Sequence, residues 1–427
     1  MLDIKFIREN TELIKMAAEK KKIKFNVEEL VELDKKRLEL LQKIEDLRAK
    51  QNAVSLEVPN LSGDDKVKKI EEMSLVKGEL KKLEEEMEMV ASEWRTLMLR
   101  VPNVPDISVP DGNTDEENLE VKKWGNPKTE NEFGFKPKDH IEIMQAQDWV
   151  DFERGIKTSG FRGYFLKGDA VLLDFALWQY GMQKWAVEGF EPMLVPSLVK
   201  KETLLGSGYL PQGQDDLYND IDGDYFAGTA EVATMYYHAD EIIEKKDLPK
   251  KFISFSPCFR KEAGAHGKDV KGLYRVHEFM KLEQVVLCEA NHEESVKHHE
   301  KLTELAEEVL EELGVPYHRV INCGGDLGLG QVKKYDLEAW MPNKEKYGET
   351  GSSSYFHDFQ TRRLNIRYRD DDGKLKFVHS LNNTAIATPR LLLMIIENYQ
   401  NADGTVTVPT ALVPFMGGKK ILGKPVF

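Results

Sequence analysis

Arg260 and Glu262 are the residues whose types and spacing most clearly indicate chemistry. Arg260 ends an apolar run within residues 257–264, and Glu262 follows two positions later. A glycine-rich polar loop then leads into a second run, residues 272–279. A preorganised guanidinium can neutralise the charge that develops on a phosphate when a carboxylate is activated with ATP. The pattern predicts a strand, a loop and an antiparallel strand that present Arg260, although an ordinary charged hairpin reads the same way.

A second candidate cation, Arg390, lies in residues 377–400. The sequence VHSLNNTAIAT predicts a strand that ends in a turn of small residues, which allow a ligand to approach the backbone. Pro389 suits the first turn of a helix, so a helix is predicted to begin there. Arg390 would then point toward a polyphosphate at a helix start, where the helix dipole also favours negative charge.

The elements that must position these residues form an α+β body. Residues 170–196 predict a helix that leads through a glycine turn into a short strand ending in proline. Farther along, glycines, aromatics and β-branched runs alternate with amphipathic helices such as residues 293–313. Strands that return as hairpins predict an antiparallel sheet, and we place this catalytic domain at residues 141–427.

Composition excludes several classes of protein. With 427 residues, 41% of them hydrophobic and 31% charged, the chain can form two or three domains with a large core. No run approaches the ~18 apolar residues of a membrane helix, and the N-terminus does not read as a signal peptide. Three dispersed cysteines predict a reducing cytoplasm and neither disulfides nor a zinc site. A net charge of −14 argues against nucleic-acid binding by the whole surface.

Residues 28–100 follow a heptad pattern within an N-terminal domain of residues 1–105. Two seams of apolar residues recur every seven positions on each side of a Pro/Asn/Ser/Gly turn at residues 58–63. The pattern predicts an antiparallel two-helix coiled coil about 45 Å long. Arg37 and Gln51 replace expected leucines, so looser packing is expected there. Prolines in residues 106–140 predict a linker. The seam residues are Leu30, Leu33, Leu40, Ile44, Leu47, Val54, Met73, Val76, Leu80, Leu83, Met87, Val90, Trp94 and Leu97.

Basic side chains are predicted on the outer faces of this N-terminal domain. Glutamates are interleaved with them, so a solvated charged face is one interpretation, and contact with an RNA backbone is another. The residues alone leave both open. The basic residues are Lys20, Lys21, Lys22, Lys24, Lys35, Lys36, Arg37, Lys66, Lys68 and Lys69.

Taken in order, residues 170–196, the Arg260 hairpin and residues 377–400 resemble the three motifs of class II aminoacyl-tRNA synthetases. The segments FAGTAEV (226–232), ETGS (349–352) and DFQTRR (358–363), with the N-terminal hairpin, are similar to seryl-tRNA synthetases of the bacterial type. The resemblance covers nearly the whole chain. It implies a class II fold and a serine–tRNA ligase that forms seryl-adenylate from serine and ATP and transfers the seryl group to tRNA-Ser.

The resemblance also implies partners: ATP as substrate, Mg²⁺, tRNA-Ser held by the helical arm, tRNA-Sec where one exists, and a second copy of the chain in a homodimer. It assigns catalysis to Arg260, Glu262 and Arg390, and Mg²⁺ to Glu349 and Ser352. Serine-binding residues would be Thr229, Ala230, Glu231, Arg260, Glu283, Asn382 and Thr384. ATP-binding residues would be Arg260, Lys261, Glu262, Val276, Phe279, Glu349, Thr350, Gly351, Ser352 and Arg390.

The chain departs from the family at a few positions. The family usually has Glu-Ile-Ser-Ser where residues 349–352 read ETGS, so a hydroxyl is missing at Gly351. It usually has serine where Thr384 adds a methyl group, which leaves the amino-acid choice open. The loop of residues 263–271 carries His266 and two lysines, where contact with the tRNA acceptor end would differ.

Two other readings remain. One is an adenylate-forming paralogue that loads a carrier protein, and the heptad hairpin argues against it. The other is a coiled-coil RNA-binding protein with a degenerate catalytic body. Retained charges at Arg260, Glu262, Glu283, Glu349 and Arg390 argue against that reading.

Overall fold

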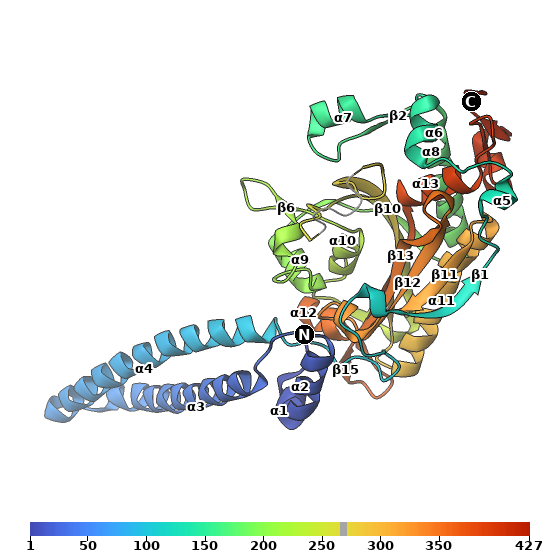
Figure 1. The fold of residues 1–427 in the computed structure, drawn as a ribbon. Helices are drawn as coiled ribbons and strands as arrows, with labels where there is room; N and C mark the ends of the chain where they lie inside the picture. The colour runs from blue at the N-terminus through green and yellow to red at the C-terminus, as the bar shows by residue number, and fades with distance from the viewer. Residues whose placement is uncertain (265–270) are drawn as a thin grey trace. The chain divides into compact units, whose positions relative to one another are not determined.

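The computed structural model describes residues 1–264 and 271–427 (Figure 1). The basic loop residues His266 and Lys268, predicted to approach tRNA, lie outside this range. The chain separates into two units. The first comprises Met1–Glu19 and Ile23–Val104, and the second comprises Lys20–Lys22 and Pro105–Phe427.

The first unit is helical. Two short helices, α1 (Ile4–Glu9) and α2 (Thr11–Lys20), precede the long helices α3 (Val27–Glu57) and α4 (Gly63–Met98). Asn26 caps α3 by accepting a hydrogen bond from the Glu29 N–H, and the turn η1 (Val58–Asn60) follows α3 with Pro59 inside it. Figure 1 shows α3 and α4 side by side as a hairpin.

The predicted heptad seam is the buried face of this hairpin. Leu40 and Ile44 on α3 and Val76 and Val90 on α4 are almost fully buried, because a stripe with spacings of three and four faces the partner helix. The expected loosening at Arg37 is wrong. Its guanidinium carbon lies 4.7 Å from the Trp94 ring centroid, and its Nη2 donates to the buried Asp34 carboxylate at 2.9 Å.

The second unit is built on an eight-stranded sheet, in the order β1-β11-β12-β13-β16-β10-β9-β4. Every neighbouring pair is antiparallel except β4 and β9, which are parallel. Residues 106–140, predicted as a linker, supply the edge strand β1. The strands are β1 (Leu119–Trp124), β4 (Glu191–Leu194), β9 (Lys250–Phe259), β10 (Glu278–Cys288), β11 (Tyr317–Ile321), β12 (Lys333–Met341), β13 (Lys346–His357) and β16 (His379–Thr388).

Helices cover this sheet and complete the core. Leu302, Leu305 and Val309 of the amphipathic α11 (His292–Glu312) are buried against it, and α11 packs on β13 and β16. The remaining helices are α5 (Glu130–Phe133), α6 (His140–Ala146), α7 (Phe152–Ser159), α8 (Gly168–Val187), α9 (Lys201–Ser207), α10 (Glu231–Tyr236), α12 (Phe359–Leu364) and α13 (Arg390–Asn398). Among the described residues, no helix is long and apolar enough to cross a bilayer.

Short strands and turns connect these elements. The strands are β2 (Val150–Asp151), β3 (Phe165–Leu166), β5 (Leu198–Val199), β6 (Tyr218–Asn219), β7 (Tyr225–Phe226), β8 (Ile242–Glu244), β14 (Arg367–Arg369), β15 (Leu375–Phe377), β17 (Val406–Thr407) and β18 (Ile421–Leu422). The 3₁₀ turns are η2 (Asp115–Glu117), η3 (Gln214–Asp216), η4 (Lys245–Asp247), η5 (Gly324–Asp326), η6 (Pro342–Lys344) and η7 (Thr410–Met416).

Candidate active site

A cavity of about 340 Å³ opens over the middle of the sheet, between the β9–β10 hairpin, β13, β16 and the start of α13. Most of the site residues predicted from sequence line it, although they come from segments far apart in the chain. These are Glu231, Arg260, Glu262, Val276, Phe279, Glu283, Glu349, Thr350, Gly351, Ser352, Asn382, Thr384 and Arg390.

Three predicted residues do not line the cavity. The Thr229 side chain is buried and its hydroxyl accepts a hydrogen bond from the Glu231 N–H at 3.3 Å, so it shapes the start of α10. Ala230 is buried immediately before that helix. The ammonium of Lys261 lies 5.6 Å from the Tyr218 ring centroid.

Arg260 follows directly after β9, at the point where the hairpin leaves the sheet. Its Nε donates to the Gly228 carbonyl at 3.2 Å, and its guanidinium carbon lies 5.4 Å from the Phe279 ring centroid. Among the described residues, its two terminal nitrogens have no acceptor. Glu262 has a left-handed φ of 52° and accepts a hydrogen bond from Arg275 at 2.8 Å. The guanidinium is therefore oriented by its neighbours while its terminal donors remain available for a ligand.

Arg390 is the first residue of α13, and Pro389 immediately precedes that helix as the sequence predicted. Its Nε donates to the Tyr274 carbonyl at 3.1 Å, and its Nη1 lies 3.2 Å from a carboxylate oxygen of Glu349. The guanidinium also stacks over the Tyr274 ring, 4.7 Å from its centroid. These contacts fix Arg390 on the same side of the cavity as the ETGS segment.

A β-bulge brings Glu349 and Ser352 to one face of β13. Glu349 pairs with Glu338, Gly351 with Leu337 and Ser352 with Asp336, so Thr350 is the extra residue. Ser352 follows Glu349 by three positions. In a regular strand, side chains three positions apart point to opposite faces of the sheet. With the bulge, both side chains line the cavity.

The chemistry of this pair fits a magnesium ion. Burial raises the pKa of Glu349, but the Arg390 guanidinium, followed by Lys334 and Arg260, outweighs burial and holds that pKa well below its usual value. The carboxylate is therefore ionised. Together with the Ser352 hydroxyl it offers hard oxygen ligands, and Mg²⁺ characteristically takes one or two carboxylates and completes its shell with phosphates and water.

Two buried carboxylates lie at the other end of the cavity. Glu231 accepts hydrogen bonds from Gln360 Nε2 at 2.6 Å and from the Tyr209 hydroxyl at 3.1 Å. Burial, and then the nearby Glu283 carboxylate, raises the pKa of Glu231. Glu283 forms an ion pair with Lys281 at 2.6 Å, with both side chains almost fully buried. The single positive charge of Lys281 does not balance two carboxylates, so this end of the cavity suits a bound ammonium group.

The two family departures, Gly351 and Thr384, lie against each other. A Cβ on Gly351 would lie 3.0 Å from Thr384 Cβ and 3.2 Å from its Cγ2 methyl carbon. The missing side chain at position 351 thus provides the space that the extra methyl group occupies. The Thr384 hydroxyl is 3.5 Å from the Glu283 carboxylate, so it still faces the carboxylate end.

We predict that Gly351→Ser crowds Thr384 and raises severalfold the KM for the serine that the family resemblance implies, with an overpacking cost of about 1–3 kcal/mol in stability. Thr384→Ser removes the methyl group and should be nearly neutral by itself. The double variant Gly351→Ser/Thr384→Ser should recover most of the lost affinity. Serine-dependent pyrophosphate exchange and thermal unfolding of all four proteins form a double-mutant cycle, and additive effects would contradict the spatial pairing.

Several residues of the site were missed from sequence. Tyr274 stacks on Arg390, and its hydroxyl donates to the Glu349 carbonyl at 3.2 Å. The neighbouring Leu273 N–H donates to His140 Nε2 at 3.2 Å, while His140 Nδ1 lies 2.7 Å from Glu397. Lys281 and Gln360 hold the two buried carboxylates. Gln360 lies in the DFQTRR segment, which gave a family signal but no role for this side chain, and Lys281 is a second charged residue in the strand that carries Glu283. Tyr274 and His140 could not be found from sequence, because their roles depend on contacts between distant segments.

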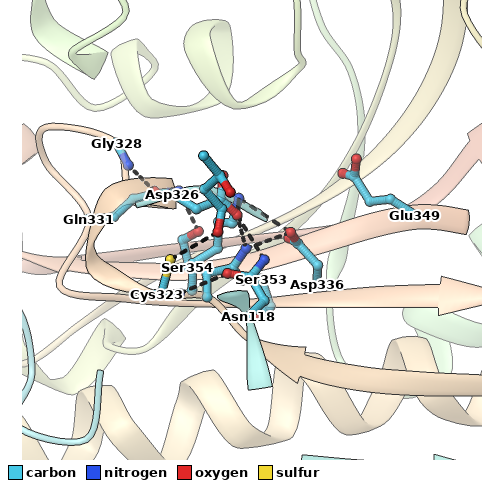
Figure 2. Close-up of polar contacts among 12 residues, drawn as sticks. Asn118, Cys323, Asp326, Gly328, Gln331, Asp336, Glu349, Ser353 and Ser354 are labelled. Atoms are coloured by element: carbon cyan, nitrogen blue, oxygen red, sulfur yellow. Dashed lines mark hydrogen bonds and ion pairs between the residues drawn. The ribbon is translucent and has the colours of Figure 1, made fainter. Parts of the chain in front are cut away.

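A polar network supports the strand beside the cavity (Figure 2). Asn322 Nδ2 donates at 2.6 Å to both Asp326 and Asp336, and Asn118 Nδ2 donates to Asp326 at 2.9 Å. Figure 2 shows Glu349 apart from this network, with no interaction to the residues drawn there. The network therefore ties β12 to the loop that precedes it, whereas the Glu349 carboxylate accepts from Arg390.

Comparison with known proteins agrees with this geometry. Residues 1–105 match the family description "Seryl-tRNA synthetase N-terminal domain", and residues 220–399 match "tRNA synthetase class II core domain (G, H, P, S and T)". A serine–tRNA ligase from Deinococcus radiodurans is 43% identical over 428 residues and covers 100% of both chains. The chain belongs to the seryl-tRNA synthetase family.

Other members of this family are also similar over their full length. The serine–tRNA ligase of Staphylococcus haemolyticus is 42% identical, with 98% of each chain covered. The crystal structure of seryl-tRNA synthetase from Pyrococcus horikoshii complexed with ATP has a TM-score of 0.90 and 38% identity, covering 99% of both chains. A Giardia lamblia prolyl-tRNA synthetase, at 17% identity and a TM-score of 0.57, shares the fold alone. The predicted class II fold, with its helical arm, and the predicted enzyme class are confirmed.

Proposed function

We propose that this seryl-tRNA synthetase family member activates L-serine with ATP and transfers the seryl group to tRNA-Ser. One observation carries the proposal. A single cavity holds two fixed guanidiniums, Arg260 and Arg390, and has two buried carboxylates, Glu231 and Glu283, at its other end. Such a cavity suits a zwitterionic amino acid beside a polyphosphate. A carrier-protein loader and a degenerate scaffold have no observation in their favour.

In the first step, a serine carboxylate oxygen attacks the α-phosphorus of ATP. The bond from that phosphorus to the bridging oxygen breaks, and pyrophosphate leaves with the electron pair. The terminal nitrogens of Arg260 neutralise charge on the α-phosphate and hold the serine carboxylate in line. Phe279 and Val276 offer an apolar slot for the adenine ring, and Glu262 and Arg275 lie at its edge.

Arg390 would bind the γ-phosphate, since it is fixed at the start of α13 by Tyr274 and Glu349. Glu349 and Ser352 would hold Mg²⁺, and a bound Mg²⁺ would neutralise negative charge on the phosphates. The protein's own contribution is to keep the Glu349 carboxylate ionised and on the same face as the Ser352 hydroxyl. No nucleophilic side chain is required for either step.

Serine recognition would use the carboxylate end. Glu231 and Glu283 suit the substrate ammonium and hydroxyl, and Asn382 and Thr384 line the same end. A buried polar site discriminates against alanine because a missing hydroxyl leaves these groups unpaired. The small space between Thr384 and β13 would exclude threonine sterically.

In the second step, a hydroxyl of the terminal adenosine of tRNA attacks the seryl carbonyl carbon, and AMP leaves. The α3–α4 hairpin would contact the long variable arm of tRNA-Ser, and of tRNA-Sec where one exists. Lys35, Lys66 and Lys68 are exposed on it and suit phosphate contacts. Several other basic residues of the hairpin form ion pairs, for example Lys36–Glu86 at 2.8 Å and Lys50–Glu72 at 3.0 Å.

A homodimer is part of the proposal. The edge strand β4 exposes Leu194, and α8 exposes Leu172 and Phe175, so an apolar surface lies at the segment that resembles motif 1. A second copy of the chain would cover it. The three cysteines are free and buried, in keeping with our expectation of a cytoplasmic enzyme.

The test of the function is pyrophosphate exchange into ATP, measured with each of the twenty amino acids and without tRNA. Exchange is expected with serine and not with alanine or threonine at comparable concentration, because the carboxylate end pairs one hydroxyl in a small space. Transfer is then measured with a tRNA-Ser transcript. Exchange with a different amino acid would contradict the serine assignment, and silence with all twenty would contradict the enzyme.

A further inference from the structure

Lys21 does not lie on an outer face as the sequence predicted. It follows α2, its residue is only 3% exposed, and it belongs with Lys20 and Lys22 to the second unit. Its ammonium donates to three backbone carbonyl oxygens: Gly328 at 3.0 Å, Leu329 at 2.9 Å and Gln331 at 2.6 Å. A lysine that is buried without a carboxylate partner requires a physical explanation.

The three carbonyls satisfy all the donor capacity of the ammonium. Among the described residues, no carboxylate forms an ion pair with Lys21. Burial lowers its pKa, whereas the three carbonyl acceptors favour the protonated form, because only the ammonium has three N–H donors. Three carbonyl oxygens that converge on one point repel one another unless a cation lies between them. The backbone conformation of this loop therefore depends on the ammonium.

The same loop, residues 328–331, forms part of the cavity wall. Gln331 closes it: its Oε1 accepts a hydrogen bond from the Gly328 N–H at 2.6 Å, and its Nε2 donates to the Ser354 hydroxyl at 2.8 Å (Figure 2). Ser354 lies on β13, where it pairs in register with Asn382 of β16. Lys21 is thus connected through one loop to the serine-binding strands.

Close packing shows that this loop has little freedom to move. A Cβ on Gly330 would lie 2.7 Å from the Phe359 ring, and a Cβ on Gly324 would lie 2.3 Å from the Lys20 carbonyl oxygen. The backbone of residues 20–22 and the segment before the loop therefore touch directly. Phe359, Ser354 and Asn382 all line the cavity.

We propose that Lys21 is a positioning residue: it holds residues 328–331 as the wall of the serine end of the cavity and thereby sets the affinity for serine. This inference rests on the proposed function. The residues proposed to bind ATP, namely Arg390, Glu349 and the β9–β10 hairpin, belong to elements other than this loop. The effect should therefore separate serine from ATP.

The test compares Lys21→Met with the matched control Lys22→Met, since Lys22 is exposed. In pyrophosphate exchange, Lys21→Met should raise the KM for serine about tenfold, the scale expected when a positioning contact shifts by less than 1 Å, and leave the KM for ATP within twofold. Lys22→Met should match the wild type in both. A serine KM unchanged in folded Lys21→Met, or an equal loss for both substrates, would overturn the proposal.

A second readout needs no substrate. Amide hydrogen exchange of a peptide spanning residues 327–332 should quicken in Lys21→Met, because three carbonyl contacts are lost, and unchanged protection would overturn the loop-holding role. Wild-type inactivity with serine would overturn the proposed function alone, since the amide exchange still decides the role of Lys21.

If Lys21→Met does not fold, Gln331→Leu is the second variant, because it removes the side-chain hydrogen bonds of Gln331 to Gly328 and Ser354. It should show the same serine-selective rise in KM. A Gln331→Leu protein with unaltered serine KM would overturn the proposal.

Discussion

Replacing Arg260 with alanine should lower serine-dependent pyrophosphate exchange about a thousandfold. The terminal nitrogens of Arg260 are the donors placed for the α-phosphate, and Gly228 and Phe279 hold the guanidinium so that it needs no reorganisation during the reaction. Most of the loss should appear in kcat, because the charge that Arg260 neutralises is greatest in the transition state.

Two further variants sharpen this prediction. Arg260→Lys keeps the charge but loses the planar fork, so it should recover only a small part of the activity. Arg154→Ala is the matched control, because Arg154 is exposed and, among the residues that the structure describes, forms its ion pair with Asp151 at the start of its own helix. Thermal unfolding confirms that each variant is folded. Retention of more than a tenth of wild-type exchange by folded Arg260→Ala would show that this guanidinium does not contact the reacting phosphate.

Shortening the α3–α4 hairpin should separate the two steps of the reaction. Replacing residues 41–89 with a short glycine-containing turn leaves the buried cluster at the hairpin base, which includes Ile7, Leu30 and Met98. It also leaves every cavity residue untouched, since the cavity is built from the second unit. Pyrophosphate exchange should stay within twofold of wild type, while serylation of tRNA-Ser should fall about a hundredfold because the phosphate contacts are lost.

The salt dependence of tRNA charging distinguishes a loss of phosphate contacts from a general loss of folding in the shortened chain. Charging by the full-length chain should weaken steeply with rising salt, whereas residual charging by the shortened chain should depend on salt much less. A matched control replaces exposed glutamates of the hairpin, such as Glu85→Gln, and should not weaken charging. Loss of pyrophosphate exchange on shortening would contradict the separation of activation from tRNA binding.

The parts predicted from sequence share one property: local spacing carries their signal. The heptad spacing of α3 and α4 places apolar residues on one stripe of each helix, independently of the partner helix. Leu40, Ile44, Val76 and Val90 could therefore be placed in the seam. Pro389 determines where a helix can begin, and Arg390 follows it. The assignment of Arg260 to an ATP site came from the order of three motifs and their resemblance to a family.

Contacts between distant segments could not be read in this way. A bulge at Thr350 decides that Glu349 and Ser352 share a face, and strand periodicity alone would have separated them. Gly351 and Thr384 are thirty-three positions apart, yet one leaves the space that the other fills. Arg37 was expected to loosen the seam and instead stacks on Trp94 across the hairpin.

The sequence by itself therefore determined the helical arm, the hairpin that carries Arg260, the helix that begins at Arg390 and the family of the chain. Tertiary structure alone decided which side chains complete the site. Lys21 shows the reason: by composition it belongs to a run of surface lysines, but it is buried against carbonyls more than three hundred residues away. Backbone acceptors carry no sequence signal, because every residue has one, and only the fold brings three of them to one point.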